Sequence, residues 1–240
     1  IQSLLDIARC AVCLETVRPD IVQCVRGHLL CGECRKGLRE CPTCRQPFSD
    51  AKPSLVLLQM LEALPKLCQY TNCRAFLEPD DDHERWCGFQ PAKCMMNRCD
   101  WVGQAQDVLS HVQKCHSRAL TVRESYQDMK FQDLNLQNFL KRYFPISAHG
   151  QFFWAEAHCN AEKEFFMVTF CLVPNGKPWE DYFIDVSIGS KESFSQSKFK
   201  FDLEMKKERN TVYVPSSWLP NFLDKDKLLR LKMVITKGKQ

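Results

Sequence analysis

The sequence predicts a multidomain protein whose first half consists of small cysteine-rich modules and whose second half is an antiparallel β-sandwich. Three observations lead to this prediction. All of the 15 cysteines except Cys159 and Cys171 lie before residue 116. Cysteine and histidine recur in this half at the spacings of metal ligands, whereas from about residue 150 apolar and polar residues alternate with the period of a β-strand. A chain of 240 residues is long enough to hold several such domains.

The first module contains eight potential metal ligands. They form three C-x2-C pairs and one C-x3-H pair: Cys10, Cys13, Cys24, His28, Cys31, Cys34, Cys41 and Cys44. Thiolates and imidazoles at these spacings bind zinc tetrahedrally, with Zn–S distances of about 2.3 Å, so eight ligands supply two closed sites. A disulfide framework is the alternative, but C-x2-C loops favour metal and nothing in the chain indicates secretion.

A linker helix and two further metal-ligand units follow. Ser54 is a suitable cap for an apolar helix through Leu64, which we expect to pack between modules or across a dimer; a partner-binding helix is the alternative. The two units read C-x4-C-x9-H-x3-C and C-x4-C-x11-H-x3-C: Cys68, Cys73, His83 and Cys87, then Cys94, Cys99, His111 and Cys115. This repetition indicates an internal duplication.

In each unit the last two ligands lie four residues apart, so a helix would point both at one metal. Asp80 to Asp82 suit the N-terminus of the first such helix, and we expect the second from Gln104 to Ala119. His116 is the alternative to Cys115 as the last ligand. The ligand count therefore predicts a zinc-rich chain with four Zn²⁺ ions, and leaves Cys159 and Cys171 as ordinary buried side chains.

The second half shows the alternation of strands with one wet face. It is clear from Tyr182 to Ile188, from Phe199 to Met205 and from Leu229 to Ile235. The Phe165 to Val173 run is apolar on both faces, which predicts a central strand. We expect Pro174 to Pro178 to be a hairpin connection between two such runs, within an antiparallel β-sandwich. No set of nucleophile, base and orienting group is apparent.

Composition excludes other classes of protein. The net charge is only +4, basic residues are scattered among acids, and Asp80 to Glu84 would repel phosphate, so we expect no nucleic-acid partner. No apolar run approaches eighteen residues, so we expect no membrane span. Many reduced cysteines need a reducing compartment, which predicts a location in the cytoplasm, the nucleus or both.

The order of these modules resembles the seven-in-absentia (SINA/SIAH) family of E3 ubiquitin ligases. Gly27-His28-Leu29-Leu30-Cys31 and Cys41-Pro42-Thr43-Cys44-Arg45 are similar to the RING core of the family, Asp133 to Leu136 resembles a segment that opens its substrate domain, and Phe165-Phe166 resembles a strand start. The finger gaps depart from the family pattern, which has six residues between the cysteines and eleven before the histidine. The resemblance implies a RING domain at 1–50, a linker helix at 51–65, tandem SIAH-type zinc fingers at 66–120 and a TRAF-like β-sandwich at 121–240.

The resemblance also implies which ligands share a metal. In a RING cross-brace, Cys10, Cys13, Cys31 and Cys34 hold the first zinc, and Cys24, His28, Cys41 and Cys44 hold the second. By the same resemblance, Val12, Leu38 and Pro42 form an apolar patch that receives a ubiquitin-conjugating enzyme. Arg45 matches a basic residue that hydrogen-bonds both ubiquitin and that enzyme.

The implied activity is that of an E3 ubiquitin transferase without a covalent ubiquitin intermediate, which directs substrates to proteasomal degradation. Its sandwich would form a homodimer and bind the extended degron peptide of a substrate as an added strand. The residues implied for this groove are Phe131, Leu134, Leu136, Phe152 and Trp154. The alternative is a zinc-dependent scaffold in the manner of TRAF-type adaptors, without ubiquitin transfer.

Overall fold

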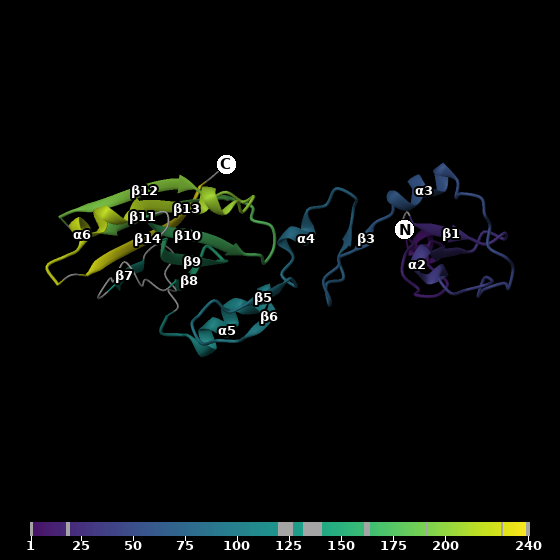
Figure 1. Cartoon of the computed structure of the whole chain (residues 1–240), viewed down its shortest axis with the longest axis horizontal. Coiled ribbons are helices and arrows are strands. Elements are labelled where there is room, and N and C mark those ends of the chain that lie inside the picture. The colour runs from purple at the N-terminus through teal and green to yellow at the C-terminus, as the bar shows by residue number, and fades with distance from the viewer. Residues whose placement is uncertain are drawn as a thin grey trace. The chain divides into compact units, whose positions relative to one another are not determined.

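The structure is a computed structural model that describes residues 2–17, 20–119, 127–131, 141–160, 164–190, 192–226 and 228–238. The chain divides into two compact units, residues 1–84 and 85–240 (Figure 1).

The first unit is built from short helices and two-stranded sheets. Its elements are α1 (Gln2–Ile7), β1 (Ile21–Gln23), β2 (Leu29–Cys31), α2 (Gly32–Arg35), α3 (Leu55–Glu62), β3 (Lys66–Leu67) and β4 (Phe76–Leu77), with α4 (His83–Trp86) beginning at its end. β1 pairs with β2 and β3 pairs with β4, both antiparallel. The buried core of the first module is small: Ala8, Cys10, Val17, Ile21, Leu30 and Leu61. So few apolar side chains are marginal for a stable domain, and small domains of this kind generally need metal or other cross-links.

The linker helix α3 forms as expected, with a slightly earlier end. The Ser54 hydroxyl accepts a hydrogen bond from the Leu57 N–H at 3.3 Å, which confirms the predicted cap. Leu61 packs into the core of the first module, whereas Val56 and Met60 on the opposite face are 65% and 57% exposed. One face of the helix is therefore structural and the other remains open to solvent.

The second unit contains the predicted sandwich. It begins with β5 (Pro91–Lys93), β6 (Val102–Gln104), the 3-10 turn η1 (Ala105–Asp107) and α5 (Val108–Cys115). The strands of the sandwich are β7 (Gln127–Phe131), β8 (Arg142–Ala148), β9 (Gln151–Asn160), β10 (Phe165–Val173), β11 (Asp181–Gly189), β12 (Phe194–Lys200), β13 (Thr211–Pro215) and β14 (Leu229–Gly238). The turns η2 (Lys207–Asn210) and η3 (Ser216–Trp218) and the helix α6 (Leu219–Phe222) lie between the later strands.

These strands form two four-stranded antiparallel sheets, in the orders β13-β10-β9-β8 and β12-β11-β14-β7. Alternate residues of β8 to β11, β13 and β14 point into a common core, as the period-two pattern predicted for Tyr182 to Ile188 and for Leu229 to Ile235. β10 lies between β9 and β13, which confirms that the doubly apolar run from Phe165 to Val173 is a central strand.

Two predicted features of the sandwich are wrong. The strand expected to continue to Met205 ends at Lys200. The Asn210 side chain bonds the Asp202 N–H and C=O at 2.7 and 2.9 Å, and a turn follows in which the Met205 N–H donates to the Asp202 C=O at 3.0 Å. The segment from Pro174 to Pro178 is not a hairpin, because β10 and β11 belong to different sheets. It crosses between the two sheets.

Residues preceding the sandwich are anchored in its core. Trp86 is buried among the core side chains of the sandwich, and its carbonyl accepts a hydrogen bond from the Gly176 N–H at 2.8 Å. The second zinc finger, which is formed by β5, β6 and α5, packs on the outer face of the sheet that contains β9. There Val108 and Val112 of α5 form a second buried cluster with Phe152 and Trp154. The second unit therefore has two apolar cores, one on each side of a single sheet.

In the part of the chain that the structure describes, no helix is long and apolar enough to cross a bilayer.

We expect Phe153→Ala to lower the free energy of unfolding of the second unit by about 3–5 kcal/mol, because its ring fills the centre of the core. The ring lies edge-on to Tyr182 and Phe201, at 5.6 Å from each. Urea unfolding of the intact zinc-loaded chain, followed by tryptophan fluorescence, measures this change. Phe194→Ala is the control, because that side chain is 55% exposed; equal losses for both variants would contradict the assigned core.

Candidate metal centres

The eight ligands of the first module fall into two groups that use alternating pairs along the chain. Cys10, Cys13, Cys31 and Cys34 form one group, and Cys24, His28, Cys41 and Cys44 form the other; within each group the ligand atoms lie within 4.8 Å of one another. The Sγ atoms of Cys13 and Cys31 are 3.8 Å apart. Two sulfurs at corners of a tetrahedron about 2.3 Å from zinc are separated by about this distance. The interleaved grouping is the one that the resemblance implied.

The β1–β2 hairpin brings distant ligands of this module together. Its turn contains Gly27 at φ +86°, a conformation that suits glycine. The turn lets the His28 N–H donate to Cys24 Sγ at 3.3 Å and directs His28 Nδ1 to 3.4 Å from the same sulfur. Cys31 ends β2, and its N–H donates to Cys10 Sγ at 3.4 Å, so the turn of the hairpin serves the second group and the far end of β2 serves the first.

The thiols of the first group have opposite pKa shifts. Burial raises the pKa of Cys10, but hydrogen bonds from the backbone N–H groups of Cys13, Cys31 and Val12 outweigh it and lower the pKa to about 6. Burial, followed by the neighbouring sulfurs of Cys13 and Cys10, raises the pKa of Cys31 to about 12. The group therefore favours one thiolate and resists further ones, and a divalent cation is the species that lets all four ionise.

The third group combines Cys68, Cys73, His83 and Cys87. His83 Nε2 lies 3.3 Å from Cys73 Sγ. The His83 N–H donates to Asp81 Oδ1 at 2.7 Å, so an aspartate of the acidic run forms a turn directly before this helix. Glu84 accepts hydrogen bonds from the Gln69 N–H and side-chain amide at 3.0 and 3.1 Å. These bonds fix the cysteine loop beside the helix.

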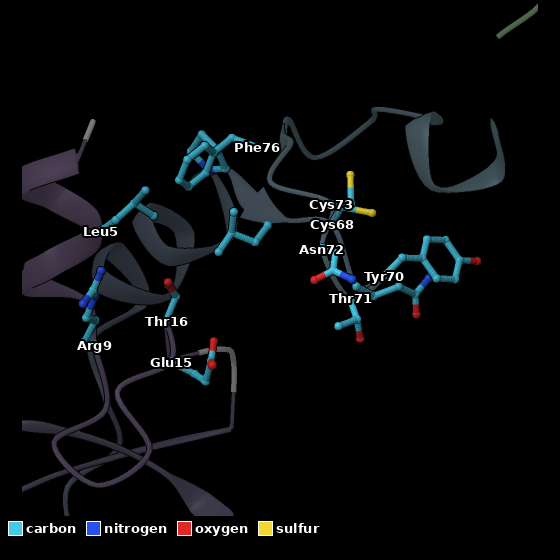
Figure 2. A pocket seen from close by; sticks show the side chains of 13 residues that line it. Leu5, Arg9, Glu15, Thr16, Cys68, Tyr70, Thr71, Asn72, Cys73 and Phe76 are labelled. Carbon is cyan, nitrogen blue, oxygen red and sulfur yellow. The ribbon is translucent and has the colours of Figure 1, made fainter. Parts of the chain in front are cut away.

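A cleft of about 580 Å³ lies next to this group within the first unit (Figure 2). Leu5, Arg9 and Thr16 lie on one side of it, and the loop with Tyr70 and Asn72 lies on the other. The Arg9 guanidinium is 3.0 Å from Asp6, so this cation is already paired. The walls mix polar and apolar groups and define no single ligand chemistry.

One ligand predicted for the fourth group is wrong. It consists of Cys94, Cys99, His111 and His116, not Cys115. α5 ends at Cys115, and His116 follows at φ −135° and ψ 31°, outside the helical region, so its side chain returns to the group while Cys115 is exposed. His116 Nε2 is buried and has no hydrogen-bond partner in the described part of the chain. An imidazole nitrogen in this state is suited to bind a metal.

His111 is fixed from two sides in the fourth group. Its ring stacks on Trp101 with centroids 4.5 Å apart, and its Nε2 lies 3.4 Å from Cys99 Sγ. Burial lowers the pKa of His111, and the charge of His116 lowers it further. Both effects favour the neutral imidazole, which is the form that binds zinc.

The four groups thus fit four zinc ions. The first group supplies four thiolates, the second and third each supply three thiolates and one imidazole, and the fourth supplies two of each. Four protein ligands leave no position for substrate, which is typical of structural rather than catalytic zinc. Zinc in such groups holds loops together. The chemistry of the protein must then come from the surfaces that those loops present.

The residues expected to contact a conjugating enzyme lie on the first module. Val12, between two ligands of the first group, is 48% exposed. Pro42, between two ligands of the second group, is also exposed, whereas Leu38 is half-buried against the core. Arg45 is exposed at φ +58°, immediately after the last ligand. All four side chains therefore have some accessible surface, and the metal groups position their loops.

Two of the residues expected to form a substrate groove, Phe152 and Trp154, are buried. Phe152 and Trp154 are each only 5% exposed, because β9 is an interior strand and the second finger covers this face of it. Their expected role at an open sheet edge is therefore wrong. Leu134, Leu136 and the side chain of Phe131 lie outside the described residues.

Trp86 and Trp101 are the structural residues that sequence analysis missed. Trp86 directly precedes Cys87, and Trp101 is separated from Cys99 by a single residue. Each is a large aromatic side chain in a short loop-rich segment. That juxtaposition was the available signal, because a buried aromatic beside a ligand indicates where a finger packs.

A cross-braced pair of metal groups, two single-metal units and a β-sandwich define a multidomain zinc protein of the RING type. Residues 10–44 match the family described as "E3 ubiquitin-protein ligase sina/sinah, RING finger". This match confirms the resemblance that the motifs indicated.

Curated relatives give the same result over a longer stretch. The chain is 32% identical over 143 residues to the E3 ubiquitin-protein ligase siah2 of Xenopus laevis, covering 56% of this chain and 45% of the relative. It is 31% identical over 160 residues to the E3 ubiquitin-protein ligase SIAH2 of Homo sapiens, covering 63% and 49%. For the probable E3 ubiquitin-protein ligase sinah of Drosophila melanogaster the identity is 31% over 156 residues, covering 62% and 44%. The chain therefore spans about half the length of the curated relatives that it matches.

We expect His116→Ala to lower the zinc content of the chain by about one ion in the presence of a competing chelator, because it removes one of four ligands. Cys115→Ser is the matched control and should keep all four ions. Elemental analysis after dialysis measures the zinc-to-protein ratio. The opposite ranking of the two variants would restore Cys115 as the ligand.

Proposed function

We propose that this protein is a RING-type E3 ubiquitin ligase. The observation that carries the proposal is the cross-braced zinc pair at residues 10–44, which matches the sina/sinah RING family and presents Val12, Pro42 and Arg45 on exposed loops. In this proposal the RING binds a conjugating enzyme charged with ubiquitin, and ubiquitin passes directly to a lysine of a substrate.

The catalytic contribution is one of positioning. Val12 and Pro42 would dock the conjugating enzyme through apolar contacts, with Leu38 completing the patch. Arg45 would donate hydrogen bonds that hold ubiquitin against that enzyme, so that its thioester stays in a reactive orientation. Restricting a thioester in this way lowers the entropic part of the barrier without any covalent step on the ligase.

The intact zinc-loaded chain should accelerate discharge of ubiquitin from a conjugating enzyme to free lysine, and Val12→Arg should abolish most of that acceleration, because a charge would be buried in an apolar contact. Gel-based discharge assays across a panel of conjugating enzymes measure the rate. If no enzyme in the panel is stimulated while four zinc ions remain bound, the TRAF-type scaffold without transferase activity becomes the better description.

Arg45→Ala should retain binding of the conjugating enzyme and lose discharge by about tenfold or more, because the lost hydrogen bonds act on the reactive conformation rather than on docking. Arg26→Ala is the matched control, since Arg26 is an exposed arginine of the same module. Binding is measured by calorimetry and discharge in the same assay as above. Unchanged discharge in Arg45→Ala would remove this residue from the mechanism.

The remaining parts of the proposal concern the whole protein. We infer that the sandwich recruits substrates through an extended degron peptide and forms a homodimer, and that the outcome is proteasomal degradation. The cysteines of the four metal groups must stay reduced in order to bind zinc, which supports a reducing location in the cytoplasm or nucleus. Fractionation of cells and sedimentation of the purified chain test the location and the dimer.

A further inference from the structure

Leu38 lies in the segment that joins the two metal groups of the first module. The helix α2 ends at Arg35, immediately after Cys34, which is the last ligand of the first group. The ligands of the second group resume at Cys41. The residues between these points belong to no helix or strand, so the position of Leu38 depends on local bonds.

The segment begins with a tight turn that fixes the N–H of Leu38. Lys36 has φ −59° and ψ 128°, and Gly37 has φ +82°. These values match the central residues of a type II β-turn, in which the second of them favours glycine. The Leu38 N–H closes the turn by donating to the Arg35 C=O at 3.1 Å.

The side chain of Arg35 holds the other end of the same peptide unit. Its Nη1 atom donates a hydrogen bond to the Leu38 C=O. A charged donor makes a stronger hydrogen bond than a neutral one. Both backbone polar groups of Leu38 are therefore bonded to Arg35, the N–H through the main chain and the C=O through the guanidinium.

The guanidinium of Arg35 rests on an aromatic ring. Its Cζ atom lies 4.0 Å from the centroid of the Phe48 ring, which is the geometry of a cation–π contact. Phe48 packs against the core of the first module and forms a β-bridge with Cys24, a ligand of the second metal group. Arg35 follows a ligand of the first group directly, so its contact with Phe48 connects the two groups across the Leu38 segment.

We propose that Arg35 is a positioning residue for docking of the conjugating enzyme, because it clamps Leu38 between the two metal groups. The inference rests on the proposed ligase function, in which Leu38 completes the apolar patch. Arg35 makes no contact with the enzyme; it holds Leu38 in one orientation before the enzyme arrives. A residue that had to be ordered during binding would cost conformational entropy, and the clamp removes that cost.

The surroundings of Arg35 distinguish this role from simple attraction by charge. The Arg35 side chain is half-buried and is directed at Phe48 and the Leu38 C=O, whereas Arg39 is exposed in the same segment. The exposed Lys36 is paired with Glu33 at 2.7 Å. Arg39 is therefore the arginine whose loss reports the charge of the segment without disturbing the clamp.

The first test is the rate of ubiquitin discharge as a function of the concentration of charged conjugating enzyme, with the intact zinc-loaded chain. We expect Arg35→Met to raise the half-saturating concentration by about tenfold and to leave the saturated rate unchanged, because docking is weakened and the reactive conformation is not. Partial unfolding would instead lower the saturated rate. Arg39→Met is the matched control and should keep both values; equal losses in the two variants would assign the effect to charge and overturn the proposal.

A double-mutant cycle with Leu38 shows whether Arg35 acts through that residue. In a chain that carries Leu38→Ala, the further change Arg35→Met should raise the half-saturating concentration by less than about twofold, because the side chain that the clamp positions is already absent. If the two effects multiply instead, Arg35 has an independent role and the positioning proposal is wrong.

Hydrogen exchange of the Leu38 amide, followed by NMR on the zinc-loaded chain, tests the clamp without ubiquitin. Arg35→Met should speed this exchange at least about fivefold, because the segment opens more often. The Val17 amide, which donates to the Ala8 C=O at 2.8 Å, should exchange at its original rate. Unchanged exchange at Leu38 would contradict the clamp.

Phe48→Leu is the second variant, and it decides the matter if Arg35→Met lowers the midpoint of thermal unfolding. It removes the ring under the guanidinium but keeps an apolar side chain of similar size, so it should change the half-saturating concentration and the Leu38 exchange in the same directions. Loss of zinc from both variants would assign the effect to the metal groups and overturn the proposal.

The two readouts separate failure of this inference from failure of the proposed function. If the unchanged chain stimulates no conjugating enzyme, the ligase proposal fails and the positioning role fails with it, whatever the exchange shows. If the unchanged chain is active and Arg35→Met keeps its half-saturating concentration, the positioning role alone is wrong and the ligase proposal stands.

Discussion

Repulsion between crowded thiolates, and its reversal by a divalent cation, is the constraint on which the first half of this chain depends. The sulfurs of Cys13 and Cys31 lie 3.8 Å apart, a separation that favours ionisation of only some of the thiols in the group. Zinc turns that arrangement into net attraction, and structural sites contribute roughly 10–16 kcal/mol in isolated fingers. The apolar core around Leu30 and Leu61 is small, so the metal groups supply much of the rigidity that exposed loops need in order to present Val12 and Arg45 in fixed positions.

The fourth metal group shows how the same constraint extends into the sandwich. Its helix α5 contributes His111 to the metal and Val108 and Val112 to a cluster with Phe152 and Trp154. Metal binding and sheet packing therefore stabilise one another, because the helix that holds the ligand is also the helix that covers the sheet. The face of β9 that would otherwise expose two large aromatic rings is therefore closed to solvent.

Features encoded by local spacing could be predicted from the sequence, and features set by tertiary packing could not. The C-x2-C and C-x4-C pairs, the Ser54 cap and the central strand from Phe165 to Val173 depend on neighbouring residues alone. The choice between Cys115 and His116 depends on where α5 ends, which differs by a single residue between the two outcomes. The Pro174 to Pro178 segment has the composition of a hairpin, but whether it stays in one sheet is decided by the partners of β10 and β11. The run Phe152-Phe153-Trp154 was interpreted as part of an open groove, although apolar residues at consecutive positions are more typical of a strand covered on both faces.

The packing of the second finger on β9 determines how this protein can be divided for study. A fragment that begins after the fingers would place Phe152, Trp154 and Val173 in water and would lose Trp86 from the sandwich core. Large side chains of this kind each contribute roughly 1.5–3 kcal/mol when buried, so such a fragment would be less stable and prone to aggregate. A recombinant fragment of the sandwich should therefore start before Arg85, retain the fourth metal group and be purified with zinc.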